Sequence, residues 1–279
     1  MRIFKRLINI YIQSSIHVAL AVYSLVRMTD YMFQIPVDKP MAYFAFFGTI
    51  VGYNFVKYDS FVRTKKLQLR NSLKAIIFIS VFSFFGVGFY FFQLQRMTQI
   101  ISVLFLALTL LYTLPFFPNR KNARNWAGVK IYIVALCWVG VTLVLPILDA
   151  EIIITSEFYI KCIQRFILVF VLILIFEIID LTNDDPHLQT VPQQIGVKRT
   201  KNLGYVLLMI FCVLEFFNVN FKENFQFSVY HIVLIFVIAT VIALFLLFVN
   251  EKRSKYYTSF WVESVPIFWW LMVVLLLEK

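Results

Sequence analysis

The chain has 279 residues, of which 61% are hydrophobic, 18% aromatic and only 15% charged, and its mean hydropathy is +0.81. Soluble domains carry about 45–50% apolar and about 25% charged residues, so this composition excludes an ordinary water-soluble fold. It also excludes a disordered chain, which would be poor in apolar residues. We therefore predict an all-α, polytopic membrane protein in which residues 1–279 form a single integral-membrane domain.

The apolar stretches divide the chain into membrane spans. A span takes about 20 apolar residues, and the sequence holds nine candidate stretches. They are residues 7–27, 40–56, 73–94, 98–117, 129–148, 159–180, 203–220, 228–249 and 263–277. No gap between them is long enough for a separate soluble domain.

Basic residues predict the orientation of these spans. The net charge is +11, and most Lys and Arg residues lie before the first span and after the second, fourth, sixth and eighth. In a membrane protein such an excess marks the cytoplasmic side, so we expect no nucleic-acid partner. The alternation predicts insertion in the cytoplasmic (inner) membrane. The N-terminus is expected in the cytoplasm and the C-terminus on the opposite side.

An acidic cluster closes the sixth span and is the densest group of carboxylates in the chain. Glu177, Asp180 and Asp184 are spaced i, i+3 and i+7, which stacks them on one face of a helix. Three carboxylates at the negative end of a helix repel one another unless something positive relieves them. Mg²⁺ takes oxygen ligands, usually one or two carboxylates plus substrate phosphates. The alternative is a helix that simply ends in solvated acids.

Basic residues in neighbouring loops are expected on the same side of the membrane. Lys57 ends the second span, and further basic residues follow the fourth span: Arg120, Lys121, Arg124 and Lys130. Carboxylates with a metal on one side and cations on the other would suit a diphosphate. The positive-inside bias alone also accounts for these residues.

Isolated polar residues inside the spans give weaker signals. For His17 and Glu215 we expect hydrogen bonds between helices rather than chemistry. Lys161 and Arg165 open the sixth span, where long basic side chains can extend to the membrane surface.

These motifs together resemble the UbiA superfamily of intramembrane prenyltransferases. The spacing Glu177-x-x-Asp180-x-x-x-Asp184 is that of the family's second Asp-rich motif, D-x-x-D-x-x-x-D. Residues 190–196, T-V-P-Q-Q-I-G, are similar to the T-L-P-x-x-L-G tail that follows it. Tyr112 and Pro115 are similar to the family's Y-x-x-P region. The resemblance implies nine helices around a central cavity.

The family's first Asp-rich motif, N-D-x-x-D-x-x-x-D, is nearly lost from this chain. Asn54 matches its Asn, but Phe55 and Tyr58 stand at acid positions, and Asp59 is off the spacing. The family holds two Mg²⁺ ions, so the resemblance implies that one site remains and the other is lost. An ammonium is a compact cation with three donors, and Lys57 is predicted to stand in for the lost metal.

The resemblance implies a divergent prenyltransferase that moves a (poly)prenyl group from a prenyl diphosphate to a hydrophobic acceptor, an aromatic compound or quinone precursor. It implies Glu177, Asp180 and Asp184 as Mg²⁺ ligands, and Asp180, Asp184 and Lys57 as the catalytic set. The substrate-binding residues are expected to be Asn54, Tyr112, Arg120, Lys121, Arg124 and Lys130. Lys57 is expected to face Asp180 and Asp184; the alternative is a side chain that extends to lipid head groups.

The eroded first motif leaves a second hypothesis open, a non-catalytic relative that binds an isoprenoid or another membrane lipid. A secondary transporter is a weaker alternative, because the sequence shows neither a half-chain repeat nor a pair of broken helices. Diphosphate release from a prenyl diphosphate separates the first two hypotheses.

Overall fold

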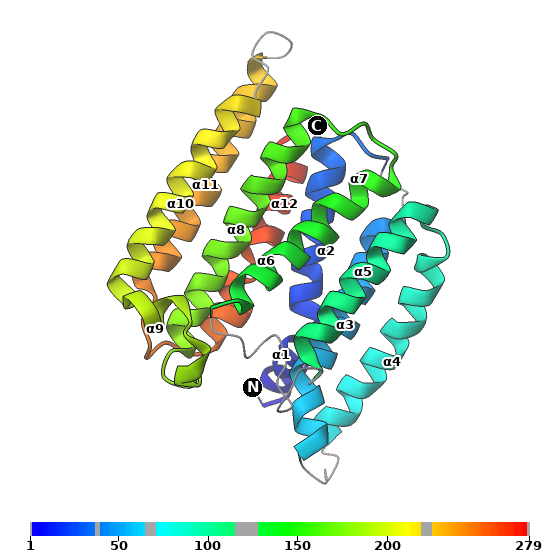
Figure 1. The fold of residues 1–279 in the computed structure, drawn as a ribbon, viewed down its shortest axis with the longest axis vertical. Coiled ribbons are helices and arrows are strands. Elements are labelled where there is room, and N and C mark those ends of the chain that lie inside the picture. Colours follow the sequence, from blue (N-terminus) through cyan, green and yellow to red (C-terminus); the bar gives the residue numbers. More distant parts are fainter. Residues whose placement is uncertain (1, 37–39, 65–70, 115–127, 219–224, 278–279) are drawn as a thin grey trace. The chain divides into compact units, whose positions relative to one another are not determined.

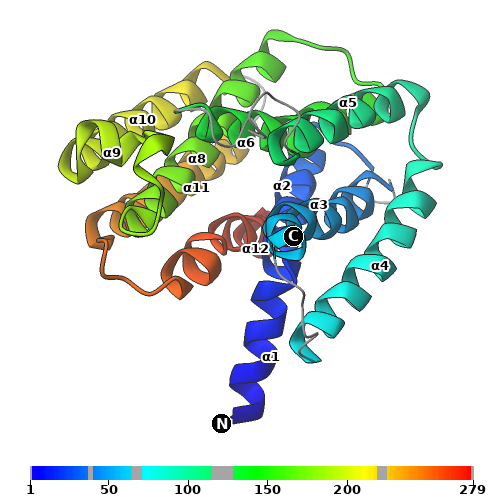
Figure 2. The ribbon, with the colours of Figure 1, turned by 60° about the horizontal axis from the view of Figure 1, so that its bottom comes forward.

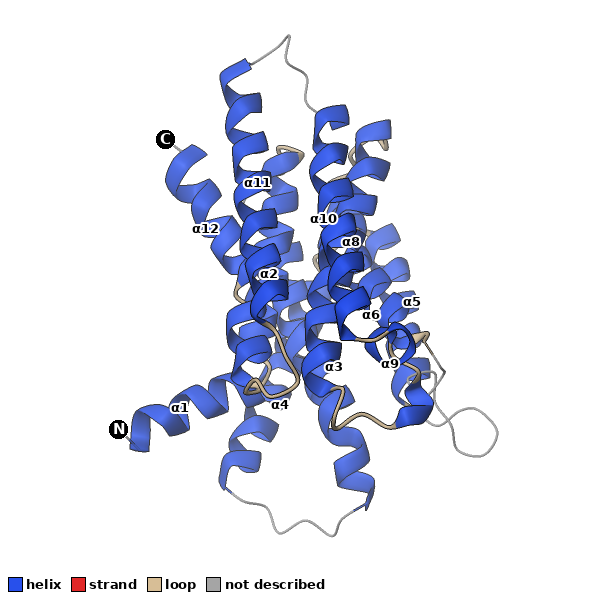
Figure 3. Ribbon diagram, turned by 90° about the vertical axis from the view of Figure 1, so that its left-hand side faces the viewer, coloured by secondary structure: helices blue, strands red, loops and turns tan. Residues whose placement is uncertain are grey.

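The computed structural model describes residues 2–36, 40–64, 71–114, 128–218 and 225–277, and every regular element there is a helix (Figure 3). The contacts divide the chain into two compact units. Unit 1 comprises Met1–Ala123 and Gly140–Ile152, and unit 2 comprises Arg124–Val139 and Ile153–Lys279.

Unit 1 is a helical layer built around α3. Its elements are α1 (Arg2–Gln13), α2 (Ile16–Met32), α3 (Met41–Thr64), α4 (Asn71–Phe91), α5 (Arg96–Thr113), a π-helical turn (Gly140–Val144) and α7 (Leu145–Asp149). Helix α3 packs against both α2 and α4, and α5 packs against α7 (Figure 1).

The π-helical turn of unit 1 has an identifiable cause. Pro146 has no backbone N–H, so the carbonyl of Thr142, four residues earlier, loses its helical donor. The hydroxyl of Thr29 on α2 donates to that carbonyl at 2.7 Å. On the same turn a side chain at Gly140 would collide with the ring of Phe105 on α5. A hydrogen bond and a glycine thus hold the broken helix against its neighbours.

Unit 2 is built around α8, its most deeply buried helix. The elements are α6 (Lys130–Val139), α8 (Ser156–Asp180), a 3₁₀ turn (Pro186–Leu188), α9 (Val191–Ile195), α10 (Val197–Asn218), α11 (Phe225–Phe248), a π-helical segment (Tyr257–Val262) and α12 (Val265–Leu277). Helix α8 packs against α6 and α10, and α10 packs against α11 (Figure 1). Leu168, Leu174, Ile175 and Ile178 of α8 are fully buried.

The helices agree in part with the predicted spans. Seven helical stretches of the described residues are long and apolar enough to cross a membrane: 73–91, 96–113, 130–149, 156–180, 197–217, 230–248 and 257–276. Each coincides with a predicted span. The all-helical prediction is confirmed for the described residues, and the seven apolar helices are consistent with a polytopic membrane protein. The predicted second span lies within α3, which is not among the seven, so the count of nine crossings stays a prediction.

The predicted first span, residues 7–27, is broken. Residues 7–13 and 16–32 are separate helices that meet at 59°, and only together do they pass as one span. Figure 2 shows α1 running from α2 to the N-terminus at the bottom of the view, and Figure 3 shows the angle between the two helices. The bend falls at Gln13, Ser14 and Ser15, the polar residues that interrupt the apolar stretch in the sequence.

The bond from Thr29 to Thr142 gives a first testable prediction. We expect Thr29→Val to lower the stability of the folded protein by about 0.6–1.7 kcal/mol, the range for hydrogen bonds between membrane helices, because the buried Thr142 carbonyl loses its donor. Thr240→Val is the matched control, since the Thr240 hydroxyl donates at 2.8 Å to Phe236 one turn earlier on its own helix. Denaturation by SDS in mixed micelles, followed by circular dichroism, measures both; equal losses would contradict the prediction.

Candidate functional site

The acidic cluster lies in unit 2, where α8 ends. The helix ends at Asp180, but the backbone N–H of Asp184 still donates to the carbonyl of Asp180 at 2.8 Å. The chain therefore continues for one more turn beyond the helix, with Asp180 at its start and Asp184 at its end.

Glu177 faces the interior of unit 2. Its side chain is buried, with 2% of the residue exposed, and its Oε2 accepts a hydrogen bond from the backbone N–H of Val191 at 3.2 Å. Val191 begins α9, so Glu177 holds the start of α9 against the end of α8. A carboxylate at a helix N-terminus is favourable for both partners. This geometry gives Glu177 a positioning role.

Two of the predicted site residues, Asp184 and Lys130, lie close together in the structure. Lys130 is the first residue of α6, and its Nζ lies 3.8 Å from Oδ2 of Asp184. This ion pair is too long for a hydrogen bond, and Oδ2 of Asp184 is a buried oxygen without a hydrogen-bond partner. A buried acceptor without a donor is explained by strain, by an ordered water or ion, or by a catalytic or ligand-binding role, and Thr98 Oγ1, outside the predicted site, is in the same state.

The loop between α8 and α9 is tied together by residues that the sequence analysis missed. The side-chain oxygen of Gln193 accepts from the backbone N–H of Thr190 at 2.9 Å, and its nitrogen donates to the carbonyl of Asp185 at 3.2 Å. Gln193 follows Thr190 by three residues, the spacing of a helix-capping box, so the sequence held a signal for it.

A backbone bond connects the residues before α6 to this loop: the N–H of Gly128 donates to the carbonyl of Leu188 at 2.9 Å. Within the loop, the side chain of Gln194 donates to the carbonyl of Gln189 at 2.6 Å. Gly128 has φ of +69°, a conformation that other residues rarely adopt. Two residues later the chain reaches Lys130, so these bonds place the lysine opposite Asp184.

The predicted three-carboxylate metal site does not assemble as a ready-made ligand set. Among the described residues, no three His, Cys, Asp or Glu side chains are grouped so that they could hold one ion. The inward position of Glu177 explains this. Asp180 and Asp184 lie one turn apart where α8 ends, joined by the backbone bond from the N–H of Asp184 to the carbonyl of Asp180.

The site residues predicted in unit 1 have structural partners. Asn54 is buried, with three hydrogen bonds: its Oδ1 accepts from Ser15 Oγ at 2.8 Å, and its Nδ2 donates to Ser14 O at 3.1 Å and Ser80 Oγ at 2.8 Å. Tyr112 is buried in the last turn of α5, with 7% exposed.

Lys57 belongs to the same region of unit 1. Its Nζ donates to the carbonyl of Gln13 at 3.3 Å and lies 5.8 Å from the ring centre of Tyr58. The acids lie in unit 2, so the predicted approach of Lys57 to Asp180 and Asp184 stays a prediction. Arg120, Lys121 and Arg124 lie outside the described residues, as does the side chain of Asp59.

A buried charged cluster in unit 2 corrects one expectation from the sequence. Lys161 does not extend to the membrane surface. It is buried, and its Nζ pairs with Glu215 of α10 at 2.8 Å and 3.1 Å. The side chain of Gln164 donates both to Glu215 and to the carbonyl of Phe211, each at 3.0 Å. Glu215 thus makes the hydrogen bonds between helices that the sequence predicted for it.

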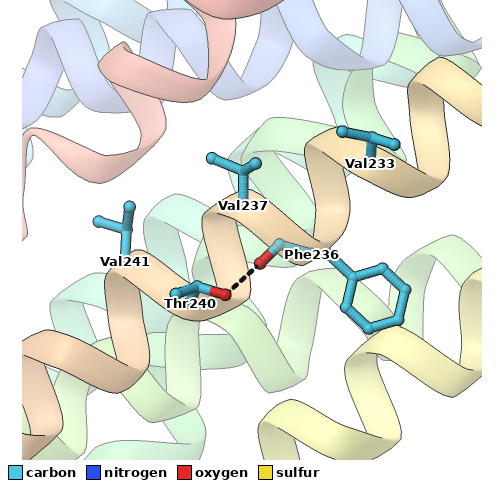
Figure 4. Close-up of a pocket in the computed structure, with 5 residues that line it drawn as sticks. All are labelled: Val233, Phe236, Val237, Thr240 and Val241. Carbon is cyan, nitrogen blue, oxygen red and sulfur yellow. Dashed lines mark hydrogen bonds between the residues drawn. The ribbon is translucent and has the colours of Figure 1, made fainter.

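One surface groove of α11 is apolar. Val233, Phe236, Val237, Thr240 and Val241 line it, and the hydroxyl of Thr240 is bonded to the carbonyl of Phe236 (Figure 4). Four of its five lining side chains are apolar and the Thr240 hydroxyl is bonded within its own helix, so the groove is an apolar packing surface.

Comparison with known proteins adds no relative. No family model matches the chain, and neither a curated protein nor a solved structure matches it.

Proposed function

We propose that the chain is a divergent UbiA-type prenyltransferase whose diphosphate site lies at the end of α8. The observation that carries the proposal is the pair formed by Asp184 and Lys130. It joins a buried carboxylate oxygen without a hydrogen-bond partner to an ammonium 3.8 Å away. The proposal includes nine membrane crossings around a central cavity, in the cytoplasmic membrane, with the N-terminus in the cytoplasm.

The chemistry at this site divides between the residues. Asp180 and Asp184 would hold one Mg²⁺, which when bound supplies positive charge to the leaving diphosphate. Lys130 is free to turn from Asp184 to a diphosphate oxygen, because its present contact is a long ion pair. The bond from prenyl C1 to oxygen breaks and the diphosphate keeps the electron pair. An electron pair of the acceptor then forms a bond to C1, and the acceptor releases a proton.

A non-catalytic role in binding an isoprenoid lipid is the second candidate, and one observation favours it. In unit 1, where the family carries its first motif, Asn54 and Lys57 are bonded to the bend between α1 and α2. A chain that lost its second metal site and used the remaining residues for structure would keep a lipid site without turnover.

The predicted test is diphosphate release by the purified, reconstituted protein with Mg²⁺ and prenyl diphosphates of graded length. We expect Asp184→Asn to lower the release rate on the order of 10²-fold, the usual cost of removing one group that stabilises developing charge. Asp185→Asn is the matched control. Asp185 accepts from the N–H of His187 at 2.9 Å, and an amide oxygen can keep that bond.

Three outcomes separate the candidates. Release that Asp184→Asn abolishes and Asp185→Asn leaves intact supports the transferase. No release, but saturable binding of prenyl diphosphates that Asp184→Asn weakens, supports the lipid-binding relative. Neither release nor binding overturns the proposed site, as does release that is equal in both variants.

A further inference from the structure

The proposed function assigns no role to the N-terminal helix α1 or to its junction with α2. Helix α1 has 12 residues and α2 has 17, and they meet at 59°. With 17 residues, α2 lies at the lower limit of length for a span, and it passes the test of length and apolarity only together with residues 7–13. The 59° bend turns α1 away from the axis of α2. Figure 3 shows α1 at a steep angle to the adjoining α2.

Side chains of α3 fix the bend. At its start, the carbonyl of Gln13 accepts from Lys57 Nζ at 3.3 Å and from the hydroxyl of Tyr58 at 2.9 Å. The last carbonyls of a helix lack helical donors, and a cation there also suits the helix dipole. Lys57 and Tyr58 thus satisfy the group that the break exposes.

The next two residues of the bend are held by Asn54. It donates to the carbonyl of Ser14 and accepts from the hydroxyl of Ser15. Ser15 has φ of +62°, a left-handed conformation that non-glycine residues rarely adopt. Ser14 and Ser15 are both buried, at 0% and 3% exposed. A left-handed residue, buried and held by side-chain bonds, marks a fixed angle.

A contact across the bend closes the junction. The hydroxyl of Tyr11 lies 2.8 Å from Nδ1 of His17, and their rings meet edge to face. Tyr11 belongs to α1 and His17 to the first turn of α2, so this bond joins the two helices directly. The angle is thus set by bonds within the pair as well as by α3.

The sequence of α1 is amphipathic. Polar residues occur at positions 2, 5, 6, 9 and 13, intervals of three and four that place them on one side of a helix. Three of the five are basic, and the remaining positions are apolar or aromatic. On the part of α1 with described side chains, Leu7 is 59% exposed. A basic polar side with a wide apolar side is the pattern of a helix that lies in a membrane interface.

We propose that α1 lies along the membrane surface and binds the anionic phospholipid head groups there, with α3 holding it at the angle that this position needs. Continuity with α2 argues for lipid as the occupant, because α1 begins at the membrane surface when α2 crosses the membrane as a short span by itself. The charge argues for anionic lipid, since Arg2, Lys5 and Arg6 carry three positive charges within five positions.

The depth of residue 7 tests the proposal in the full chain. A Leu7→Cys variant, with Cys137, Cys162 and Cys212 replaced by alanine, is spin-labelled and reconstituted in vesicles. These contain phosphatidylcholine alone or mixed with phosphatidylglycerol. We expect a depth of about 5–10 Å near the head groups in anionic vesicles. The label should be more exposed to water without anionic lipid or at high salt. A label at Phe85, an exposed residue in the middle of α4, is the control and should stay in the acyl region in every vesicle.

Charge variants test the basic side. Neutralising Arg2, Lys5 and Arg6 to glutamine should remove the dependence on anionic lipid. The matched control replaces three exposed basic residues, Lys198, Arg199 and Lys252, with glutamine, so it removes the same number of positive charges. The dependence of the label depth on anionic lipid should stay unchanged in this control. The native chain gives a second readout without label or cysteine replacement. Tryptic cleavage after Lys5 and Arg6 should be slower in anionic vesicles than in neutral ones.

Opposite results overturn the proposal. Residue 7 at the centre of the bilayer would make α1 part of a span. A depth or cleavage rate independent of lipid charge would remove the anionic surface as its ligand. A position that changes only with protein density in the vesicle would assign α1 to a second copy of the chain.

Discussion

Glu215→Gln should lower the stability of the folded protein by about 3–5 kcal/mol, the usual cost of breaking a buried ion pair from one side. The amide keeps the shape of the side chain and a hydrogen bond to Gln164, but it leaves the Lys161 ammonium without its counter-charge. Lys161 and Glu215 are 6% and 3% exposed, so water cannot compensate. Denaturation by SDS in mixed micelles, followed by circular dichroism, is the measurement.

The double variant isolates the ion pair from the shape of the site. Lys161→Met together with Glu215→Gln removes both charges, so its loss should be well below the sum of the two single losses. Lys198→Met is the matched control, because Lys198 lies on α10, the helix that carries Glu215, with an exposed side chain. It should stay within about 0.5 kcal/mol of the parent. Additive losses would show that Lys161 and Glu215 do not stabilise each other.

The positions of the helices could be predicted from the sequence because long apolar stretches mark them. Long apolar stretches found the seven helical segments that are able to span a membrane, whichever partners they pack against. The break of the first span was visible only as Gln13, Ser14 and Ser15 interrupting it. Its angle depends on Asn54 and Lys57, which are about forty residues away in the sequence. Such long-range bonds have no local pattern.

The candidate site was predicted unevenly for a similar reason. Helical spacing placed Glu177, Asp180 and Asp184 on one helix, and the structure has Glu177 and Asp180 in the last turn of α8 and Asp184 in the turn beyond the helix. The spacing does not predict which of the three carboxylates points into the interior of unit 2. In the structure it is Glu177, which accepts a hydrogen bond from the backbone N–H of Val191. The sequence offered several basic loop residues as partners for the acids, and it did not predict which of them would pair with Asp184. Lys130 was singled out only by the bond from Gly128 to Leu188, which brings the start of α6 to the loop.

Asn54→Leu should lower stability by about 2–3 kcal/mol, because three hydrogen bonds of about 1 kcal/mol each are lost in a buried junction. The carbonyl of Ser14 and the hydroxyl of Ser15 would lose the partners that hold the bend. Thr49→Val is the control on the same helix, since the Thr49 hydroxyl donates only one turn back, to the carbonyl of Ala45 at 2.7 Å. Its loss should be under about 1 kcal/mol, as for a polar group bonded within its own helix.

The same variant separates structure from substrate binding at Asn54. If Asn54 serves the bend, the unfolding midpoint of Asn54→Leu falls, and the spin label at residue 7 loses its fixed depth in anionic vesicles. Asn54→Asp keeps the acceptor for the Ser15 hydroxyl, but it places a carboxylate oxygen against the Ser14 carbonyl in a buried site, so its loss should be at least as large. If Asn54 instead binds the diphosphate, as the resemblance implies, Asn54→Leu leaves both the midpoint and the label depth unchanged. In that case only the affinity for a prenyl diphosphate falls, and the structural role argued for Asn54 is wrong.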